Sequence, residues 1–346
     1  MAQKKGSNAI KSPSKSQPKS RARSINTIPL YILLVVLFVL YVMFQKTALL
    51  SALFGIALFF TIITIIAIEV IASVHEEGGK RSIAELLLAV VLVVVFWFSL
   101  QVLLNTSEPL NVVPTCSMLP VLHRGDLIAI HGISNATQLR APIVNVSAST
   151  WSNALSNFSS NFAFCVAYNQ SNPSTASEQY KPGDSLALYV SDLGGGRLIA
   201  PSSQKGLIKY SCGVDNVRLS NGSTIQEAYT NAITIGNTTI NGDMNNSIVV
   251  YKTLPKDYFY QEGDGYIVHR VYAIIHSGSS YFVLTKGDNN PGLDIQFGNY
   301  PIEINSTKSY VEGKVIAVIP YLGYLRLIFS SQISEPMGCN STMLNG

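Results

Sequence analysis

Three long apolar runs dominate the first third of this 346-residue chain. Each run is close to or above the ~20 residues that a helix needs to cross a hydrocarbon core ~30 Å thick. The pattern predicts three transmembrane helices, at about 28–44, 47–72 and 86–104. The first two runs could instead form a re-entrant hairpin, because only Gln45 and Lys46 separate them.

A second pattern begins after residue 104, where short runs rich in Val, Ile and Tyr alternate with Gly, Asp, Asn or Pro. Such runs are typical of strands joined by turns, and they predict a mainly β domain with an antiparallel core. The segment 315–329 is also apolar, but Pro320 and Gly323 interrupt it, so we expect a strand followed by a stretch lying on the bilayer surface. The predicted strands are Leu127–Ile130, Ser247–Lys252, Gly265–Ile275, Tyr281–Lys286 and Tyr310–Pro320.

The region 135–246 lies between these strands and differs from them in composition. It is rich in Ser, Asn, Thr and Gly and has weak periodicity, which predicts a large inserted β and loop region. We therefore expect a β core made of 105–134 plus 247–329, interrupted by the insertion and followed by a C-terminal tail at 330–346.

Charge sets the expected orientation. Residues 1–27 carry seven Lys or Arg and no acid, while the whole chain has a formal net charge of only +4. We expect a disordered basic tail that stays cytoplasmic, because Lys and Arg are enriched on the cytoplasmic side of membrane helices. We therefore expect a multi-pass protein of the cell membrane. Its three spans would place the β domain on the outer side of that membrane. Beyond the tail there is no basic patch interleaved with aromatic residues, which argues against nucleic-acid binding.

Ten Asn-x-Ser/Thr sequons agree with this orientation, because all of them lie beyond residue 104. Sequons of this kind are N-glycosylation acceptors on exported domains, so we expect a glycosylated outer surface. The sequon residues are Asn105, Asn135, Asn145, Asn157, Asn169, Asn221, Asn237, Asn245, Asn305 and Asn340.

The four cysteines follow no metal-ligand spacing. Cys165 and Cys212 flank the Ser/Asn-rich region, and they could form a disulfide or remain two buried thiols. We expect no metal and no other cofactor.

One serine, Ser117, stands out because it follows the third apolar run by about a dozen residues. A serine hydroxyl needs a neighbouring base to become a nucleophile. Among the five histidines, His269 lies inside a predicted strand, on the face of Ile267 and Val271. A hairpin would return an Asp-rich turn, residues 286–294, to the side of this histidine, where a carboxylate could orient the ring.

Several motifs around these residues resemble the type I signal peptidases, specifically the archaeal and endoplasmic-reticulum type with a Ser-His-Asp site. The similarity covers about 112–134 and 247–325. The matching motifs are Ser117-Met118-Leu119-Pro120, Arg124-Gly125-Asp126, Ile267-Val268-His269-Arg270-Val271, Lys286-Gly287-Asp288-Asn289-Asn290, Gly313-Lys314-Val315 and Ile319-Pro320-Tyr321-Leu322-Gly323-Tyr324.

The resemblance implies a role for each matching residue. Ser117 matches the nucleophile, and His269 stands where the bacterial branch has a lysine general base. Thr115 matches a hydroxyl position that joins the Ser117 backbone N–H in an oxyanion hole. The family uses two aspartates here: Asp294 is favoured as the triad acid, with Asp288 as a supporting or alternative acid.

The chain departs from the family pattern at three places. It has three apolar runs where one span is common, and Asn245-Asn246 stand where Gly-Asp is expected. Cys116 replaces the usual glycine before the serine, which raises Cys116 itself as a competing nucleophile. The Ser-Met-x-Pro register favours Ser117.

These observations predict a membrane-bound serine endopeptidase that removes signal peptides from secreted preproteins at the outer membrane surface. Its expected partners are such preproteins, the lipid bilayer and the secretion translocon. Two alternatives stay open: another membrane-anchored serine hydrolase, and a non-catalytic envelope glycoprotein.

Overall fold

The structure is a computed structural model that describes residues 27–44, 47–77, 79–156, 164–168, 197–199, 207–304, 310–332, 334, 336 and 338–344. The basic tail, apart from Thr27, and the connector Gln45-Lys46 lie outside the described residues, as do the sequon residues Asn157, Asn169 and Asn305.

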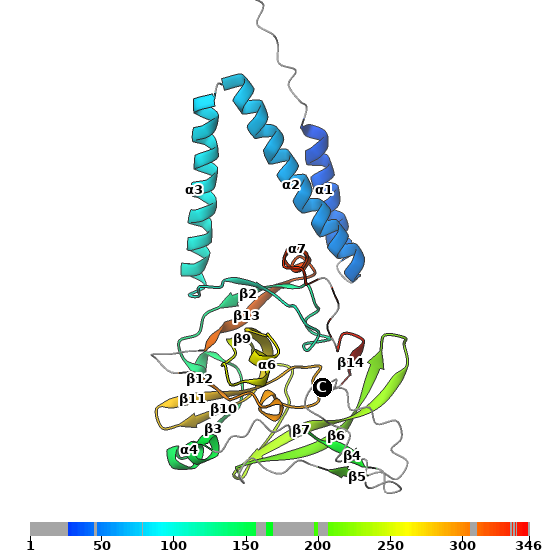
Figure 1. Cartoon of the computed structure of the whole chain (residues 1–346), viewed down its shortest axis with the longest axis vertical. Coiled ribbons are helices and arrows are strands. Elements are labelled where there is room, and N and C mark those ends of the chain that lie inside the picture. The colour runs from blue at the N-terminus through cyan, green and yellow to red at the C-terminus, as the bar shows by residue number, and fades with distance from the viewer. Residues whose placement is uncertain are drawn as a thin grey trace, which may run out of the picture.

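Three apolar helices form the N-terminal part and stand on one end of the β domain (Figure 1). α1 lies along α2, whereas α3 meets α2 at the end far from the β domain and diverges from it toward the domain. They are α1 (Ile28–Met43), α2 (Ala48–Glu77) and α3 (Gly79–Leu103). Two segments, Leu49–Ala72 and Leu86–Leu103, are long and apolar enough to cross a membrane. The first predicted span is a shorter apolar helix of 16 residues.

The main sheet of the β domain has the strand order β1-β2-β13-β9-β10-β11-β12. All neighbours along this order are antiparallel, whereas β3 pairs with β10 in parallel. The prediction of an antiparallel β domain after the helices is therefore confirmed. The strands are β1 (Leu110–Val112), β2 (Leu127–His131), β3 (Ile143–Asn145), β9 (Ile248–Lys252), β10 (Tyr266–Ser277), β11 (Ser280–Lys286), β12 (Ile302–Ile304) and β13 (Val311–Ile319).

A second sheet has the order β14-β6-β7-β8, and a small pair β4-β5 accompanies it. Its strands are β6 (Ile208–Leu219), β7 (Thr224–Ile235), β8 (Thr238–Asn241) and β14 (Ser341–Met343), and the pair is β4 (Val166–Tyr168) and β5 (Arg197–Ile199). The segment expected to be a C-terminal tail thus contributes a strand. The region expected to be an insertion also contributes β3 to the main sheet, so the two parts are interwoven.

Strand β10 is buried on both faces, and this positions the candidate site. One hydrophobic cluster contains Ile267, Val271 and Phe297. The cluster on the other face contains Tyr272 and Ile275 of β10 together with Ile233 of the second sheet. The side chains of β10 are therefore enclosed on both faces of the strand, and Val268 packs in a third cluster together with Met118.

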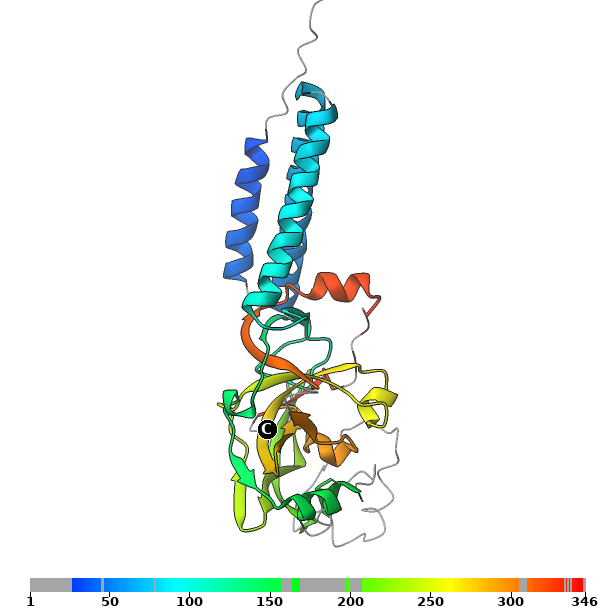
Figure 2. The same cartoon turned by 90° about the vertical axis from the view of Figure 1, so that its left-hand side faces the viewer.

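Short helices complete the domain: η1 (Ala136–Gln138), α4 (Ala148–Ser156), α6 (Tyr258–Gln261), η2 (Asp294–Phe297) and α7 (Tyr324–Phe329). Helix α7 lies close to the lower ends of the long helices and to one side of them (Figure 2). The Tyr41 hydroxyl of α1 donates to the Pro320 carbonyl, 2.5 Å away, and so links the helices to the segment before α7.

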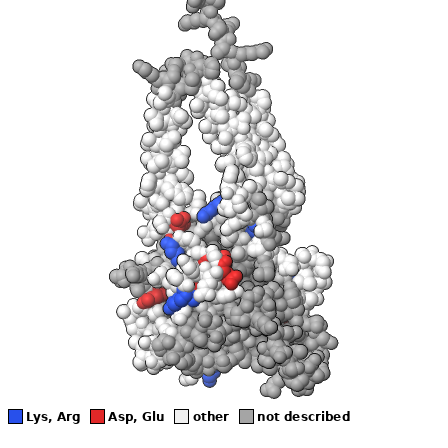
Figure 3. Space-filling view, in the orientation of Figure 1, with Lys and Arg blue, Asp and Glu red and all other residues white. Residues whose placement is uncertain are grey.

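Exposed apolar side chains continue from the helices onto this junction, including Ile319 at the end of β13 and Phe329 at the end of α7. Figure 3 shows little charge on the described part of the helices in this view, while Lys, Arg, Asp and Glu gather on the β domain and the junction. The predicted strand over 310–320 is present as β13, and the apolar stretch after it includes the short helix α7.

Candidate active site

Ser117 lies in the loop between β1 and β2, and buried neighbours hold that loop. Met118 is 0% and Leu122 1% exposed, and both pack with Ile128 of β2. The carboxylate of Asp126 accepts hydrogen bonds from the backbone N–H groups of His123, at 2.7 Å, and Tyr321, at 3.0 Å. Ser117 itself stays half-buried, so its hydroxyl is presented from a fixed loop.

The Ser117 hydroxyl meets a histidine from the centre of the main sheet. Oγ of Ser117 lies 3.0 Å from Nε2 of His269 on β10. His269 is only 2% exposed, and the ring of Phe259 stands edge-on beside it. The buried strand therefore fixes the imidazole while the serine loop brings the hydroxyl to it.

Asp294 completes this chain of contacts from the first turn of η2. Both of its carboxylate oxygens lie 2.8 Å from Nδ1 of His269. One of them also accepts hydrogen bonds from the hydroxyls of Tyr251, at 2.7 Å, and Thr285, at 2.5 Å. A carboxylate at Nδ1 holds that nitrogen in its protonated form, which leaves Nε2 to accept the proton of Ser117.

The electrostatics of Asp294 favour the ionised form. Full burial by itself raises the carboxyl pKa. The charge of His269 and the hydrogen bonds from His269, Thr285 and Tyr251 outweigh that effect, so the pKa of Asp294 lies below its usual value. A carboxylate that remains ionised at neutral pH can stabilise a protonated imidazole.

Asp288 lies in the same loop but has a different partner. Its two oxygens accept hydrogen bonds from Nε and Nη2 of Arg270, both at 2.8 Å. Arg270 also donates to the carbonyls of Asn246, at 2.8 Å, and Met244, at 2.5 Å. The pair joins the loop between β11 and η2 to the segment before β9. The structure thus brings Ser117, His269 and Asp294 together, and it pairs Asp288 with Arg270.

Thr115 lies beside the serine, with its Oγ1 3.3 Å from Oγ of Ser117. Among the described residues the backbone N–H of Ser117 has no acceptor. A hydroxyl and an N–H beside a serine hydroxyl are the kind of donors that can stabilise an oxyanion.

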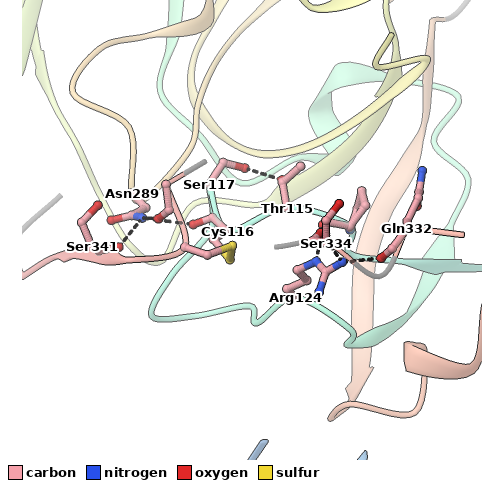
Figure 4. The surroundings of a disulfide bond; sticks show 11 residues. Thr115, Cys116, Ser117, Arg124, Asn289, Gln332, Ser334 and Ser341 are labelled. Carbon is pink, nitrogen blue, oxygen red and sulfur yellow. Dashed lines mark hydrogen bonds between the residues drawn. A yellow bond between two sulfur atoms is a disulfide. The ribbon is translucent and has the colours of Figure 1, made fainter. Parts of the chain in front are cut away.

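All four cysteines are paired. Cys116 is bonded to Cys339 (Figure 4). Cys165 is bonded to Cys212. The second bond decides between the two predictions made for Cys165 and Cys212. The first removes Cys116 as a competing nucleophile, because a disulfide sulfur is no thiolate.

Sequence reasoning missed three features of this site. The Cys116–Cys339 bond joins residues 223 positions apart, and no spacing rule indicates it. The ion pair of Arg270 with Asp288 and the hydrogen bond from Asn289 to the Cys116 carbonyl were also missed, although each of these residues adjoins a predicted site residue. The sequence signal that could have located Arg270 is its position next to His269 in a predicted strand. Because neighbouring residues of a strand point to opposite faces, Arg270 is expected on the face opposite His269.

A buried group of charges lies where the two sheets meet. Asp215 of β6 and Glu227 of β7 are directly paired across the strands, and both are buried. Two effects raise the pKa of Glu227 to about 7: burial is the larger cause, and the negative charge of the nearby Asp215 is the smaller one. Burial lowers the pKa of Lys286, at the end of β11, to about 8, against the opposing effect of the surrounding carboxylates. Within the described ranges, no group of three or more His, Cys, Asp or Glu side chains is arranged to hold a metal ion.

A comparison with known proteins finds one partial similarity. The chain is 39% identical over 64 residues to the signal peptidase complex catalytic subunit SEC11 of Colletotrichum graminicola. The match covers 18% of this chain and 37% of that subunit. It supports a signal-peptidase-like relationship. No family model and no solved structure matches the chain.

Proposed function

We propose that this protein is a membrane-bound serine endopeptidase that removes signal peptides from preproteins. The observation that carries the proposal is the run of contacts from Ser117 through His269 to Asp294, at 3.0 and 2.8 Å. The partial similarity to a signal peptidase subunit and the two long apolar helices support the choice of substrate.

In the proposed reaction, Oγ of Ser117 attacks the scissile carbonyl while Nε2 of His269 takes the hydroxyl proton. The resulting oxyanion is held by the Ser117 N–H and the Thr115 hydroxyl; a preorganised donor of this kind is typically worth ~3–4 kcal/mol. His269 then gives its proton to the departing amine, which leaves an acyl-enzyme. Water attacks that ester through the same base and regenerates the serine.

The placement of the serine supports work at a membrane surface. Helix α3 ends at Leu103, and Ser117 follows within a short segment of chain. In the proposed orientation the basic tail is cytoplasmic and the β domain lies outside the cell membrane. A preprotein would then present its cleavage site as an extended segment beside a strand edge of the domain. Association with the secretion translocon is part of the same proposal.

Processing of a secretory preprotein in membranes tests the function. We expect Ser117→Ala and His269→Ala each to abolish cleavage, because each removes one partner of the proton transfer. Ser279→Ala and His276→Ala are matched controls, since both residues lie at the far end of the β10–β11 hairpin. Full processing by either active-site variant would contradict the proposal.

Two further measurements separate the alternative functions. Labelling of Ser117 by an organophosphonate distinguishes a serine hydrolase from a non-catalytic glycoprotein. If the serine is labelled but no preprotein with small residues before its cleavage site is cut, the protein is a serine hydrolase with a different substrate.

A further inference from the structure

The C-terminal segment runs along the loop that carries the serine. We define the C-terminal strap as the described residues of 332–344, which end in β14. The Arg124 guanidinium donates to the carbonyls of Gln332 and of Ser334, the latter at 3.0 Å, and through Nε to the Pro114 carbonyl at 3.1 Å (Figure 4). The Cys116–Cys339 disulfide is a second attachment. The strap is therefore fastened to both ends of the segment 114–116, directly before the nucleophile.

Asn289 provides a third attachment and joins the strap to the serine itself. Its backbone N–H donates to the Ser117 carbonyl at 2.7 Å. Its side-chain Nδ2 donates to the carbonyls of Cys116, at 3.1 Å, and Ser341, at 2.9 Å (Figure 4). Its Oδ1 accepts from the backbone N–H of Met343 at 2.7 Å.

One of these bonds acts on the group that would face the oxyanion. The Cys116 carbonyl and the Ser117 N–H are the two polar ends of a single planar peptide unit. A donor that fixes the carbonyl therefore fixes the direction of the N–H. The disulfide at the Cys116 side chain restrains the same peptide unit from its other side.

We propose that Asn289 and the Cys116–Cys339 disulfide are positioning elements that aim the Ser117 N–H at the developing oxyanion. This inference rests on the proposed function. It makes the C-terminal strap part of the active site. It also makes catalysis sensitive to thiol reductants. A dithiol such as dithiothreitol would reduce the bond to two thiols, transferring two electrons and two protons, and would itself be oxidised to a cyclic disulfide.

Steady-state and labelling kinetics of the full chain in detergent test the role of Asn289. We expect Asn289→Ala to lower kcat about tenfold, part of the loss typical for removing an oxyanion donor, while KM changes by less than about twofold. The rate of Ser117 labelling by an organophosphonate should fall by a similar factor. All rates are normalised to titrated active sites, so a loss of folded protein alone does not move them. Asn290→Ala is the matched control, because no hydrogen bond of the Asn290 side chain occurs within the described residues.

The disulfide is tested separately by the double variant Cys116→Ala, Cys339→Ala. We expect the same loss of kcat, and the rate of this variant should no longer respond to dithiothreitol. The double variant Cys165→Ala, Cys212→Ala also loses one disulfide, and it should keep the wild-type rate.

The outcomes separate the inference from the function on which it rests. Wild-type rates in both Asn289→Ala and the Cys116/Cys339 variant overturn the positioning role. An Asn289→Ala protein that fails to fold, together with a Cys116/Cys339 variant at the wild-type rate, overturns it as well. If the wild type cleaves no preprotein but its Ser117 is labelled, the proposed substrate fails while the labelling rates still test the positioning role.

Discussion

Both carboxylate oxygens of Asp294 lie 2.8 Å from Nδ1 of His269, at the side of the ring opposite Ser117. Asp288 is six positions earlier in the same loop, but its oxygens are occupied by Arg270. We infer that Asp294 is the triad acid and that Asp288 supports the loop through an ion pair. Substituting each aspartate in turn should therefore distinguish the two roles, because one substitution should lower the catalytic rate and the other the stability of the fold.

The first prediction compares Asp294→Asn with Asp288→Asn. The amide at 294 no longer holds Nδ1 of His269 in its protonated form, so we expect kcat to fall by on the order of 10⁴-fold with the fold retained. Asp288→Asn leaves the buried Arg270 without its counter-charge, which should cost about 3–5 kcal/mol of stability. We expect it to lower Tm while the rate per titrated active site stays far above that of Asp294→Asn. Equal rates in the two variants would contradict the assignment.

The second prediction concerns the hydroxyls that hold Asp294 in its ionised form. Tyr251→Phe removes a 2.7 Å hydrogen bond to the carboxylate, and that bond lowers the pKa of Asp294. The pKa should therefore rise, so the carboxylate becomes protonated at a higher pH. We expect the acid limb of the kcat profile to move to higher pH. The exposed Tyr260→Phe is the control, and an acid limb identical to wild type in Tyr251→Phe would contradict the argument.

The strands that carry the site could be predicted from the sequence because their apolar runs are bounded by turn residues. β10 and β11 are long, and the alternation along β10 placed His269 correctly against Ile267 and Val271. The choice between Asp288 and Asp294 could not be made, because both lie in one loop. Only the three-dimensional course of that loop sends one carboxylate to His269 and the other to Arg270.

The second sheet was not predicted as such, for a different physical reason. β7 buries adjacent pairs of residues, 227–228 and 232–233, and the alternation of buried positions along β6 is interrupted at 212–214. The buried positions also include Asp215 and Glu227, so the apolar period that signals a strand is broken. β14 is three residues long and gains its stability from pairing with β6 and from Asn289. Neither contact has a local sequence signal.

The third prediction uses Glu227, whose pKa is raised from 4.5 to about 7. The folded protein therefore binds a proton that the unfolded chain has already lost, and stability falls as pH rises from about 4.5 to 7. We expect Glu227→Gln to be more stable than wild type by roughly 1–3 kcal/mol at pH 8 and nearly equal to it at pH 4. Denaturant unfolding at the two pH values measures the difference. Glu262 is exposed, so Glu262→Gln should show no such pH dependence. An equal effect of Glu227→Gln on stability at both pH values would contradict the predicted fall of stability with rising pH.

The last prediction tests the proposed orientation of the β domain. Seven of the sequon asparagines lie among the described residues, and the side chains of all seven are exposed. Asn237, in the turn between β7 and β8, is one of them. In microsomes that attach N-glycans, we expect the chain to migrate more slowly until it is treated with an endoglycosidase. Asn237→Gln should remove one glycan, because the acceptor amide is lost.

Asn231→Gln is the matched control, because Asn231 is an exposed residue in the same sheet but lies in no sequon. An inserted sequon within residues 1–26 should stay unmodified, since the basic tail is expected on the opposite side of the membrane. Glycosylation of the inserted sequon, with none in the β domain, would show that the orientation is the reverse of the proposed one. A reversed domain would place Ser117 on the cytoplasmic side, away from signal peptides that have crossed the membrane.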